Sequence, residues 1–257
     1  MAAFEPAQVK WIHHWNERLF SLGVTRKPTF RFINGHFTML GLEGEKRPTM
    51  RAYSIASPEY EDHLEFLSIK VEDGALTSRL KDVKPGDTVL LGQKPVGSLV
   101  LGDLRPGRNI YLFATGTGLA PYLALIRDPE IYERFEHVVV VHGVRVVSDL
   151  AYRELLSKDI TQHPYIGEQA SKQLIYYPTV TREPFEHEGR ITNAVESGSL
   201  TESIGLPALD PAQDRAMICG SMAVLRDLSA LLDSMGFTCS PNQGEPGDYV
   251  VERSFVD

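Results

Sequence analysis

Cysteine is scarce in this chain, which contains only Cys219 and Cys239 among its 257 residues. Two thiols cannot build a framework of several disulfides, and an iron–sulfur cluster normally takes four cysteine ligands. A cysteine content this low is typical of proteins in a reducing compartment. The sequence therefore predicts a cytoplasmic protein without a built-in iron–sulfur domain.

Long apolar runs are also missing. The longest one near a predicted strand, Val138–Val141, is far too short to cross a bilayer. The first twenty residues contain acidic side chains and no unbroken apolar stretch, so we expect no secretory signal there. With 42% apolar and 23% charged residues, the composition is that of a soluble globular protein, and we expect no membrane partner.

Positive charge is not in excess. The formal net charge is −8, so we expect no nucleic-acid partner. The histidines, including His13 and His14, show no metal-ligand spacing with acidic or thiol side chains, and we expect no metal site. Neither a Gly-x-Ser-x-Gly elbow nor a paired-carboxylate arrangement stands out, which removes two common patterns of hydrolases.

The negative charge is distributed unevenly. Residues 1–103 hold thirteen basic and thirteen acidic residues, whereas residues 104–257 hold thirteen basic and twenty-one acidic ones. Pro and Gly concentrate in Gly102–Arg108. We therefore predict two domains, residues 1–103 and residues 104–257, of which the first is electrically better suited to meet an acidic partner.

The first half reads as short β segments separated by turn signals, with one helix expected at Leu76–Val83. Many short strands with Gly and Pro turns predict an antiparallel β-barrel. The candidate strands include Thr29–Phe32, His36–Leu42, Met50–Ile55, His63–Val71 and Thr88–Gly92.

The pattern of predicted elements changes after Asp103, where strands alternate with helices. His137–His142 is the continuous β-branched run that is typical of a parallel sheet. The alternation predicts a doubly wound α/β domain that binds a nucleotide. The other expected strands are Asn109–Ala114, Gln173–Val180 and Arg215–Cys219, and the expected helices are Pro121–Arg127, Ala151–Ser157 and Met222–Met235.

A glycine-rich loop, Thr115–Pro121, follows a predicted strand and opens a predicted helix. Gly116 and Gly118 let the backbone approach a ligand closely, and free N–H groups at a helix start attract a phosphate. Pro121 stands where the third glycine of the six-residue dinucleotide fingerprint would be. The alternative interpretation is an ordinary strand–turn–helix junction.

Three further segments are ambiguous when each is taken alone. Arg51–Ser57 (Arg-Ala-Tyr-Ser-Ile-Ala-Ser) can be a plain strand. Gly74–Ser78 (Gly-Ala-Leu-Thr-Ser) feeds hydroxyls into a helix start, which suits either an anion site or simple capping by Asp73 or a nearby hydroxyl. Cys219-Gly-Ser221 lies between a strand and a helix, and its thiol can be a buried structural cysteine.

Three arginines stand at ends of strands or in loops after them: Arg145, Arg182 and Arg190. Each alone would suit a solvated surface position. Together, in a domain with net negative charge, they favour binding of the 2′-phosphate of NADPH, since NADH would favour a carboxylate on the ribose.

The order Arg-x-Tyr-Ser, Gly-x-x-Thr-Ser, Thr-Gly-Thr-Gly and Cys-Gly, each in its expected element, resembles the ferredoxin–NADP reductase family. The last residues, Tyr249–Asp257, are similar to those of the longer-tailed bacterial subgroup, where they cover FAD. Two positions depart from the usual pattern: Met222 replaces a Pro, and Ser254 replaces an Ala.

The resemblance implies a set of flavin-binding residues. Arg51 would pair with the FAD pyrophosphate, Tyr53 would lie against the isoalloxazine, and Ser54 would reach the flavin N5 edge. Strict alternation along a strand puts Ser54 on the face opposite Arg51 and Tyr53, so the ligand would have to wrap the strand end. Further FAD-binding residues implied are Ala52, Ile69, Lys70, Gly74, Thr77, Ser78, Thr117, Ser254 and Phe255.

The resemblance also implies the nucleotide site and the catalytic residues. The NADP-binding set would be Thr115, Gly116, Gly118, Arg145, Thr181, Arg182 and Arg190. Ser54, Cys219 and Glu252 would be catalytic, with the Cys219 thiol packed where the nicotinamide meets the flavin.

The function implied is an FAD-dependent oxidoreductase that exchanges hydride with NADP(H) and single electrons with ferredoxin or flavodoxin. Two alternatives stay open. One is a reductase of free flavins, or the reductase component of an oxygenase, within the same superfamily. The other is a regulatory module that binds flavin or nucleotide without turnover.

Overall fold

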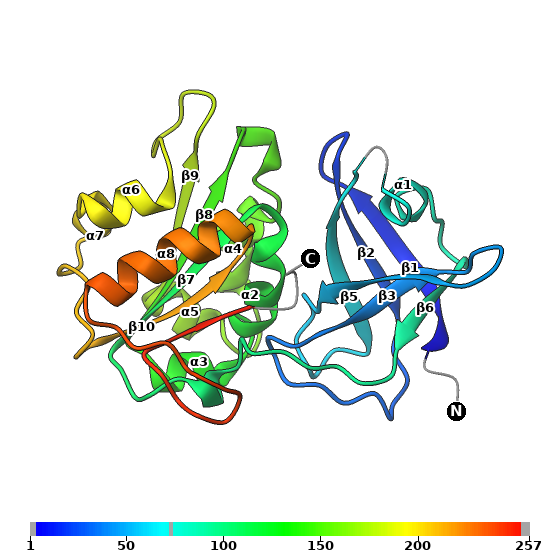
Figure 1. Ribbon diagram of the computed structural model, residues 1–257, viewed down its shortest axis with the longest axis horizontal. Helices are drawn as coiled ribbons and strands as arrows, with labels where there is room; N and C mark the ends of the chain where they lie inside the picture. The colour runs from blue at the N-terminus through cyan, green and yellow to red at the C-terminus, as the bar shows by residue number, and fades with distance from the viewer. Residues whose placement is uncertain (1–3, 72–73, 253–257) are drawn as a thin grey trace.

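The computed structural model describes residues 4–71 and 74–252, and the chain forms two sheets that lie side by side (Figure 1). The first sheet contains six strands from residues 4–92, and the second contains five strands from residues 109–251. The segment between them, residues 93–108, contains the predicted domain limit between residues 103 and 104, which stays a prediction. No helix in the described ranges is long and apolar enough to span a membrane.

The first sheet is an antiparallel, nearly closed barrel, as predicted. Its strand order is β4-β3-β6-β1-β2-β5, so that β4 and β5 are the two ends of the order. The two end strands pack together, and the hydroxyl of Tyr53 on β4 lies 3.1 Å from that of Ser68 on β5. The strands are β1 (Phe4–His14), β2 (Leu19–Thr25), β3 (Phe37–Leu42), β4 (Thr49–Ser54), β5 (His63–Ile69) and β6 (Thr88–Gly92).

The predicted strand Thr29–Phe32 is wrong, because residues 26–36 form an irregular loop. Phe30 and Phe32 are both buried, so the alternation marked the buried side chains correctly. The backbone of this loop, however, bonds to a side chain rather than to a neighbouring strand. The Arg26 guanidinium donates to the carbonyl of Phe30 (2.9 Å) and also to those of Glu59 and Glu61.

The second sheet is parallel, with the strand order β11-β10-β7-β8-β9, which confirms the doubly wound prediction. The chain runs outward from β7 through β8 to β9 and then returns to place β10 on the other side of β7. Ligands of such sheets bind at the carboxyl ends of the strands on either side of this reversal. The strands are β7 (Asn109–Thr115), β8 (His137–Val144), β9 (Leu174–Val180), β10 (Asp214–Cys219) and β11 (Tyr249–Val251).

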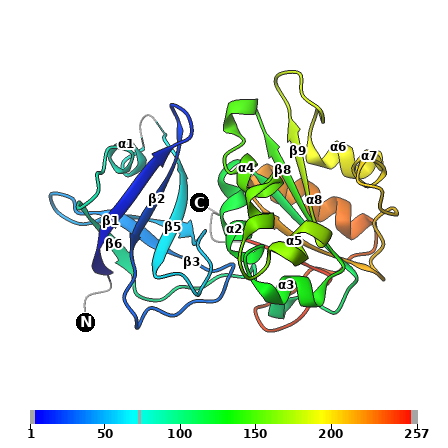
Figure 2. The same cartoon turned by 180° about the vertical axis from the view of Figure 1, so that it is seen from behind.

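Helices cover both faces of the parallel sheet (Figures 1 and 2). Ile110 and Leu112 of β7 face one layer, whereas Tyr111 and Phe113 face the other, as period-two alternation requires. One layer contains α2 (Ala120–Leu125), α3 (Pro129–Arg134), α4 (Arg153–Ser157) and α5 (Gly167–Gln173), and the other contains α6 (Ile191–Glu196), α7 (Ser199–Ser203) and α8 (Met222–Ser234).

Short helical turns fill several connections. They are α1 (Thr77–Leu80), which is shorter than the predicted Leu76–Val83, and the 3-10 helices η1 (Leu101–Asp103), η2 (Gly116–Leu119), η3 (Val147–Asp149) and η4 (Asp159–Gln162).

One apolar core crosses the boundary between the two sheets. Leu19, Ala56 and Leu67 of the barrel belong to the same buried cluster as Leu119 of η2 and Leu123 of α2. The barrel therefore packs on the layer that starts with the glycine-rich turn, and the two halves share their interior.

Candidate active site

The carboxyl ends of β7 and β10 come into backbone contact at the reversal of strand order. A Cβ atom added to Gly118 would lie 2.4 Å from the carbonyl oxygen of Cys219, and one added to Gly220 would lie 2.1 Å from Thr115 Oγ1. Real Cβ atoms do not approach other atoms so closely, so both positions require glycine. The predicted Thr115–Gly118 loop and the Cys219-Gly220 segment thus form one junction.

Hydrogen bonds complete this junction. Thr115 Oγ1 accepts from the backbone N–H of Ser221 at 3.3 Å, and the Ser221 hydroxyl accepts from Val224 N at 3.4 Å. Ser221 is therefore the N-cap of α8, which begins at Met222. Thr117 is half-buried within η2.

A buried histidine of β8 forms a hydrogen bond with the glycine-rich turn. His142 Nε2 lies 3.1 Å from the carbonyl oxygen of Gly116, and its Nδ1 lies 3.3 Å from the Tyr176 hydroxyl. Desolvation lowers the pKa of His142 to about 4, so the imidazole is neutral at pH 7. A neutral ring that donates from Nε2 to Gly116 accepts at Nδ1 from Tyr176.

The three predicted phosphate-binding arginines gather where β8 and β9 end. The backbone N–H of Arg182 donates to the carbonyl of Arg145 (2.9 Å), and that of Gly189 donates to Val180 (2.9 Å), which brings Arg190 back to the end of β9. All three side chains are exposed, as is Thr181 beside them. Within the described ranges, none of the three guanidinium groups forms an ion pair.

Strand β4 presents its predicted flavin residues on two faces. Its pairing with β3 sets Arg51 opposite Leu40 and Tyr53 opposite Thr38, and alternation along the strand turns Ala52 and Ser54 to the other face. Arg51 is exposed, while Tyr53 is buried in the barrel core. In the structure, as strict alternation predicts, Ser54 therefore lies on the strand face opposite Arg51 and Tyr53.

The hydroxyl of Ser54 indicates whether a polar ligand fits at the end of β4. Its side chain is 4% exposed, and its hydroxyl has no hydrogen-bond partner among the described residues. A buried hydroxyl without a partner is costly unless a ligand or water bonds to it. This orphaned atom at the end of β4 fits the polar edge of a bound FAD.

The turn before α1 holds the other predicted FAD residues. Thr77 Oγ1 accepts from Val71 N (3.0 Å), and the Ser78 hydroxyl donates to the Gly74 carbonyl (2.7 Å). Both hydroxyls thus fix the turn itself. Ile69 ends β5, and the backbone N–H of Lys70 donates to the carbonyl of Arg18, the residue before β2.

Cys219 and Glu252 lie together behind the junction. Each side chain is 1% exposed, and the backbone N–H of Glu252 donates to the carbonyl of Ile218, the residue before Cys219. Burial raises the pKa of the Cys219 thiol far above its usual range, and the Glu252 carboxylate adds to the shift. The thiol is therefore protonated at pH 7. Ser254 and Phe255 lie outside the described residues.

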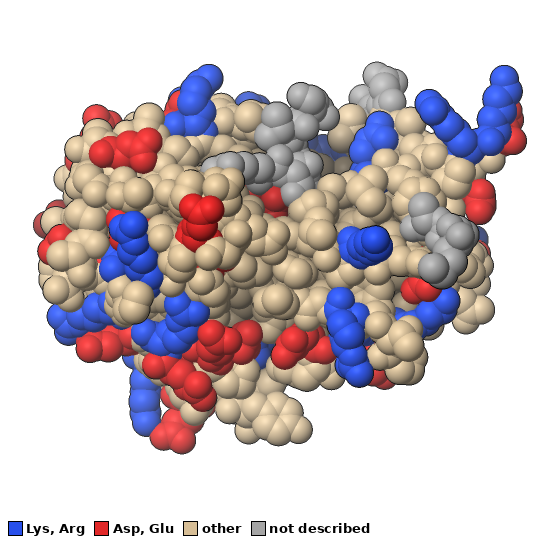
Figure 3. All heavy atoms as spheres, turned by 60° about the horizontal axis from the view of Figure 1, so that its bottom comes forward, with Lys and Arg blue, Asp and Glu red and all other residues tan. Residues whose placement is uncertain are grey.

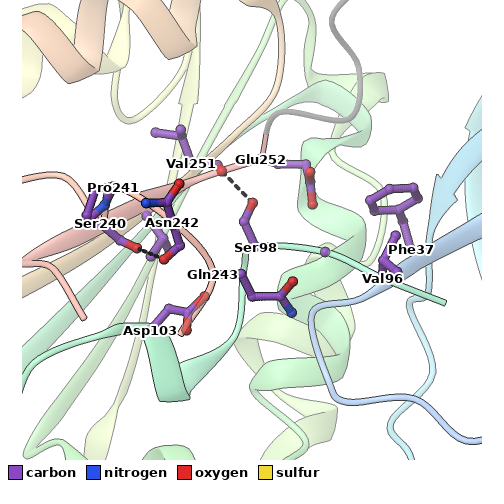
Figure 4. Close-up of a pocket in the computed structure, with 12 residues that line it drawn as sticks. Phe37, Val96, Ser98, Asp103, Ser240, Pro241, Asn242, Gln243, Val251 and Glu252 are labelled. Atoms are coloured by element: carbon purple, nitrogen blue, oxygen red, sulfur yellow. Dashed lines mark hydrogen bonds between the residues drawn. The ribbon is translucent and has the colours of Figure 1, made fainter. Parts of the chain in front are cut away.

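Glu252 also lines a cavity of about 320 Å³ at the meeting of the two halves (Figure 4). Phe37, Val96 and Ser98 form its barrel side, and the Ser98 hydroxyl donates to the Val251 carbonyl at 2.6 Å. Phe37 is the partner of Ser54 in the β3–β4 pairing. The structure thus brings Ser54, Cys219 and Glu252, the three predicted catalytic residues, to neighbouring elements.

The sequence interpretation missed the wall formed by Val96–Ser98. A Cβ on Gly97 would lie 3.1 Å from the carbonyl oxygen of Gly35 and 3.5 Å from a Glu252 carboxylate oxygen. The only local signal was the run Pro95-Val-Gly97 after β6, which is also what an ordinary loop looks like.

We expect Gly118→Ala to disrupt the junction, because its methyl group would overlap the Cys219 carbonyl oxygen, which cannot move without displacing β10. The variant should bind NADP+ at least tenfold more weakly in isothermal titration and unfold at a lower temperature. Gly102→Ala is the matched control, since nothing lies within 4 Å of its added Cβ. Wild-type affinity in Gly118→Ala would contradict the close approach.

We expect His142 to make the protein less stable in acid. Its folded-state pKa of about 4 lies below the unfolded value of 6.5, so the unfolded state binds the proton first as the pH falls between these values. Over this range His142 contributes a loss of about 1.4 kcal/mol per pH unit to the free energy of unfolding.

His142→Gln should remove that contribution, as measured by urea unfolding at several pH values, while His14→Gln, at an exposed position of β1, should retain it. An acid slope equal to that of the wild type in His142→Gln would argue against the buried neutral imidazole.

Comparisons with known proteins agree with this geometry. Residues 8–100 match the oxidoreductase FAD-binding domain, and residues 112–229 match the oxidoreductase NAD-binding domain. A ferredoxin–NADP reductase of Pseudomonas aeruginosa is 57% identical over 246 residues, 96% of this chain and 95% of the relative. A flavodoxin/ferredoxin–NADP reductase of Rhodobacter capsulatus is 47% identical over 246 residues, 95% of this chain and 91% of the relative.

A solved structure is similar over the full length. The ferredoxin NADP+ reductase from Neisseria gonorrhoeae with bound FAD and NADP has a TM-score of 0.89 and 28% identity, with 99% of this chain and 100% of that chain covered. The barrel, the parallel sheet and the junction at Gly118 and Gly220 are thus parts of one known architecture, and the chain belongs to the ferredoxin–NADP reductase family of oxidoreductases.

Proposed function

We propose that this protein is an FAD-dependent reductase that exchanges hydride with NADP(H) and single electrons with a ferredoxin or a flavodoxin. The names and identities of the relatives support the reaction, and the two matched domains support the two cofactors.

The observation that carries the proposal is the position of Glu252. Its backbone N–H donates to the carbonyl of Ile218, beside the junction of the glycine-rich turn with Cys219-Gly220. Its side chain lines a cavity together with Phe37, which is the partner of Ser54 in the β3–β4 pairing. A nucleotide at the junction and a flavin at the end of β4 would therefore meet in one place, which is what transfer between them requires.

On the barrel side, Arg51 pairs with the FAD pyrophosphate and the Ser54 hydroxyl bonds to the flavin edge. When bound, FAD supplies the chemistry, since it accepts two electrons as hydride and gives them up one at a time. The Arg51 guanidinium is exposed and forms no ion pair with any described residue, which suits the first role because its fork bonds phosphate oxygens bidentately. Lys70 and Ile69 offer backbone groups at the end of β5, and Tyr53 supports the strand from inside the barrel.

On the nucleotide side, the N–H groups of the glycine-rich turn bind the pyrophosphate, and Arg145, Arg182 and Arg190 bind the 2′-phosphate. The Cys219 thiol, kept protonated by burial, offers the nicotinamide a compact uncharged surface. Glu252 is almost fully buried and lines the cavity beside this position, where its carboxylate can bond to a bound group.

The carrier protein is acidic and docks on the barrel half. Its charge suits a surface on which Lys and Arg predominate, as the barrel side of Figure 3, on the right, shows. The unpaired cysteines, Cys219 and Cys239, suit the reducing cytoplasm. Turnover with ferredoxin, flavodoxin and free FMN, compared across salt concentrations, separates a carrier reductase from a free-flavin reductase.

We expect the purified protein to be yellow and to lose its visible absorbance under anaerobic conditions much faster with NADPH than with NADH. Stopped-flow absorbance near the flavin maximum measures both rates. A colourless preparation that takes up no added FAD would overturn the proposal.

We expect replacement of Arg145, Arg182 or Arg190 by Gln to raise the KM for NADPH by roughly tenfold, since one charge-assisted bond to the phosphate is worth about 1.5 kcal/mol. The KM for NADH should not change, because NADH lacks the 2′-phosphate. Arg108→Gln, which removes an exposed arginine beside the opposite end of β7, is the matched control. An unchanged ratio of the two KM values would refute the phosphate role.

A further inference from the structure

Arg127 lies just beyond the end of α2, the helix that the glycine-rich turn opens. Its side chain turns back on this helix, because Nε donates to the Leu123 carbonyl at 2.8 Å. The same guanidinium crosses to the barrel, where Nη2 donates to the Ala56 carbonyl at 2.6 Å and to a Glu65 carboxylate oxygen at 3.2 Å. One planar group thus bonds to three separate segments.

The two barrel acceptors lie after β4 and on β5, the strands that carry the proposed flavin site. Ala56 is two residues beyond Ser54, and Glu65 lies on β5, which ends at Ile69. They are joined to each other, since the backbone N–H of Ala56 donates to the Glu65 carbonyl at 2.8 Å. Because β4 and β5 are the two ends of the strand order, Arg127 joins the segment that follows one end strand to the other end strand.

Glu65 has a second partner from the α/β half. The Tyr152 hydroxyl donates to the other carboxylate oxygen of Glu65 at 2.6 Å and lies 2.6 Å from the Ser21 hydroxyl. Burial raises the pKa of Tyr152, so the hydroxyl keeps its proton to donate. Its ring also lies against that of Trp15, with centroids 4.5 Å apart.

The backbone of Tyr152 is strained. Its φ is +58°, the only positive φ at a non-glycine residue in the described ranges. Such a conformation persists only where the surroundings hold it, and here the side chain is held across the domain boundary. Strain at this residue and the buried charge of Glu65 both indicate a contact that has been kept for its geometry rather than for stability alone.

We propose that Arg127, together with Glu65 and Tyr152, positions the nucleotide junction against the flavin strands for hydride transfer. The inference rests on the proposed function. All residues of α2 are buried and the helix is short, which favours its displacement as a single unit. A displacement at its Arg127 end therefore moves the glycine-rich turn at its other end. An error of about 1 Å between reacting groups lowers a rate by roughly a hundredfold.

The geometry of the three acceptors requires arginine. Lysine keeps the positive charge but cannot reach the Leu123 carbonyl and the two barrel acceptors with fixed, coplanar donors. Phenylalanine at position 152 keeps the ring contact with Trp15 and loses only the hydroxyl that bonds to Glu65. Arg127→Lys and Tyr152→Phe therefore change positioning with little change in packing.

The test measures four quantities in the FAD-loaded wild type, Arg127→Lys, Arg127→Met and Tyr152→Phe. These are the rate constant of flavin reduction at saturating NADPH, the Kd for 2′-phospho-AMP, the change of flavin absorbance on binding NADP+, and the oxidation of dithionite-reduced protein by ferricyanide. Arg134→Lys is the matched control, because its guanidinium also bonds one carbonyl and one carboxylate, those of Leu104 and Glu130, but touches neither flavin strand.

We expect Arg127→Lys to lower the rate constant of flavin reduction ten- to a hundredfold and Tyr152→Phe to lower it three- to tenfold. Both should weaken the NADP+-induced change of flavin absorbance. The Kd for 2′-phospho-AMP should stay within twofold of the wild type, because this ligand touches only the nucleotide half, and the oxidation by ferricyanide should be unchanged.

Other outcomes overturn the inference. If the conservative variants reduce their flavin at the wild-type rate, or if they lose affinity for 2′-phospho-AMP and melt earlier with no change in that rate, the contact is merely structural. If Arg127→Met fails to fold, the flavin-reduction rates of Arg127→Lys and Tyr152→Phe still test the inference. A wild type that NADPH does not reduce would instead refute the proposed function itself, before any variant is compared.

Discussion

The apolar core that crosses from the barrel into the α2 layer is the constraint on which the rest of the structure depends. Without it, Leu19 and Leu67 would face water on one side and Leu119 and Leu123 on the other. Burial of such surface is the largest favourable contribution to the packing of two domains. Because this core fixes the two sheets against each other, residues from both can contribute to one site.

The polar groups around this core fall into two classes. Those of the interface are paired: the Glu65 carboxylate meets Arg127 and Tyr152, and the Trp15 indole N–H donates to Ser21 at 2.8 Å. At the end of β4, in contrast, the buried Ser54 hydroxyl has no hydrogen-bond partner among the described residues. Paired groups hold the domains rigid, and unpaired ones leave bonding capacity for a ligand. This division is the pattern expected of a preorganised site.

Much of the architecture could be predicted from the sequence, because the signals were local. The β-branched run of His137–His142 predicted an internal parallel strand, and the glycines of the Thr115–Gly118 loop predicted a turn between a strand and a helix. Strands β1 and β2 carried no clear signal. β1 lies mostly at the surface. β2 is buried on both faces, because one face lies toward the barrel interior and the other toward the helical layer that contains α2, so neither strand alternates cleanly.

What the sequence could not predict were contacts between distant segments. Nothing near Arg127 in the chain shows that it bonds to Ala56 and Glu65, and nothing near Val96–Ser98 shows that this segment forms a wall with Glu252. The prediction of a strand at Thr29–Phe32 was wrong for a related reason. Its alternation reported burial, but the partner of its backbone was the side chain of Arg26, and hydrophobic periodicity carries no information on that choice.

Strand β11 is the last described element to leave the ribosome, and it is also the one that joins the two halves at the cavity. It pairs with β10, and it accepts the hydroxyl of Ser98 from the segment between the sheets. All six barrel strands are synthesised long before this strand exists. A nascent chain therefore cannot complete the cavity between the two halves until β11 has been synthesised and has paired with β10.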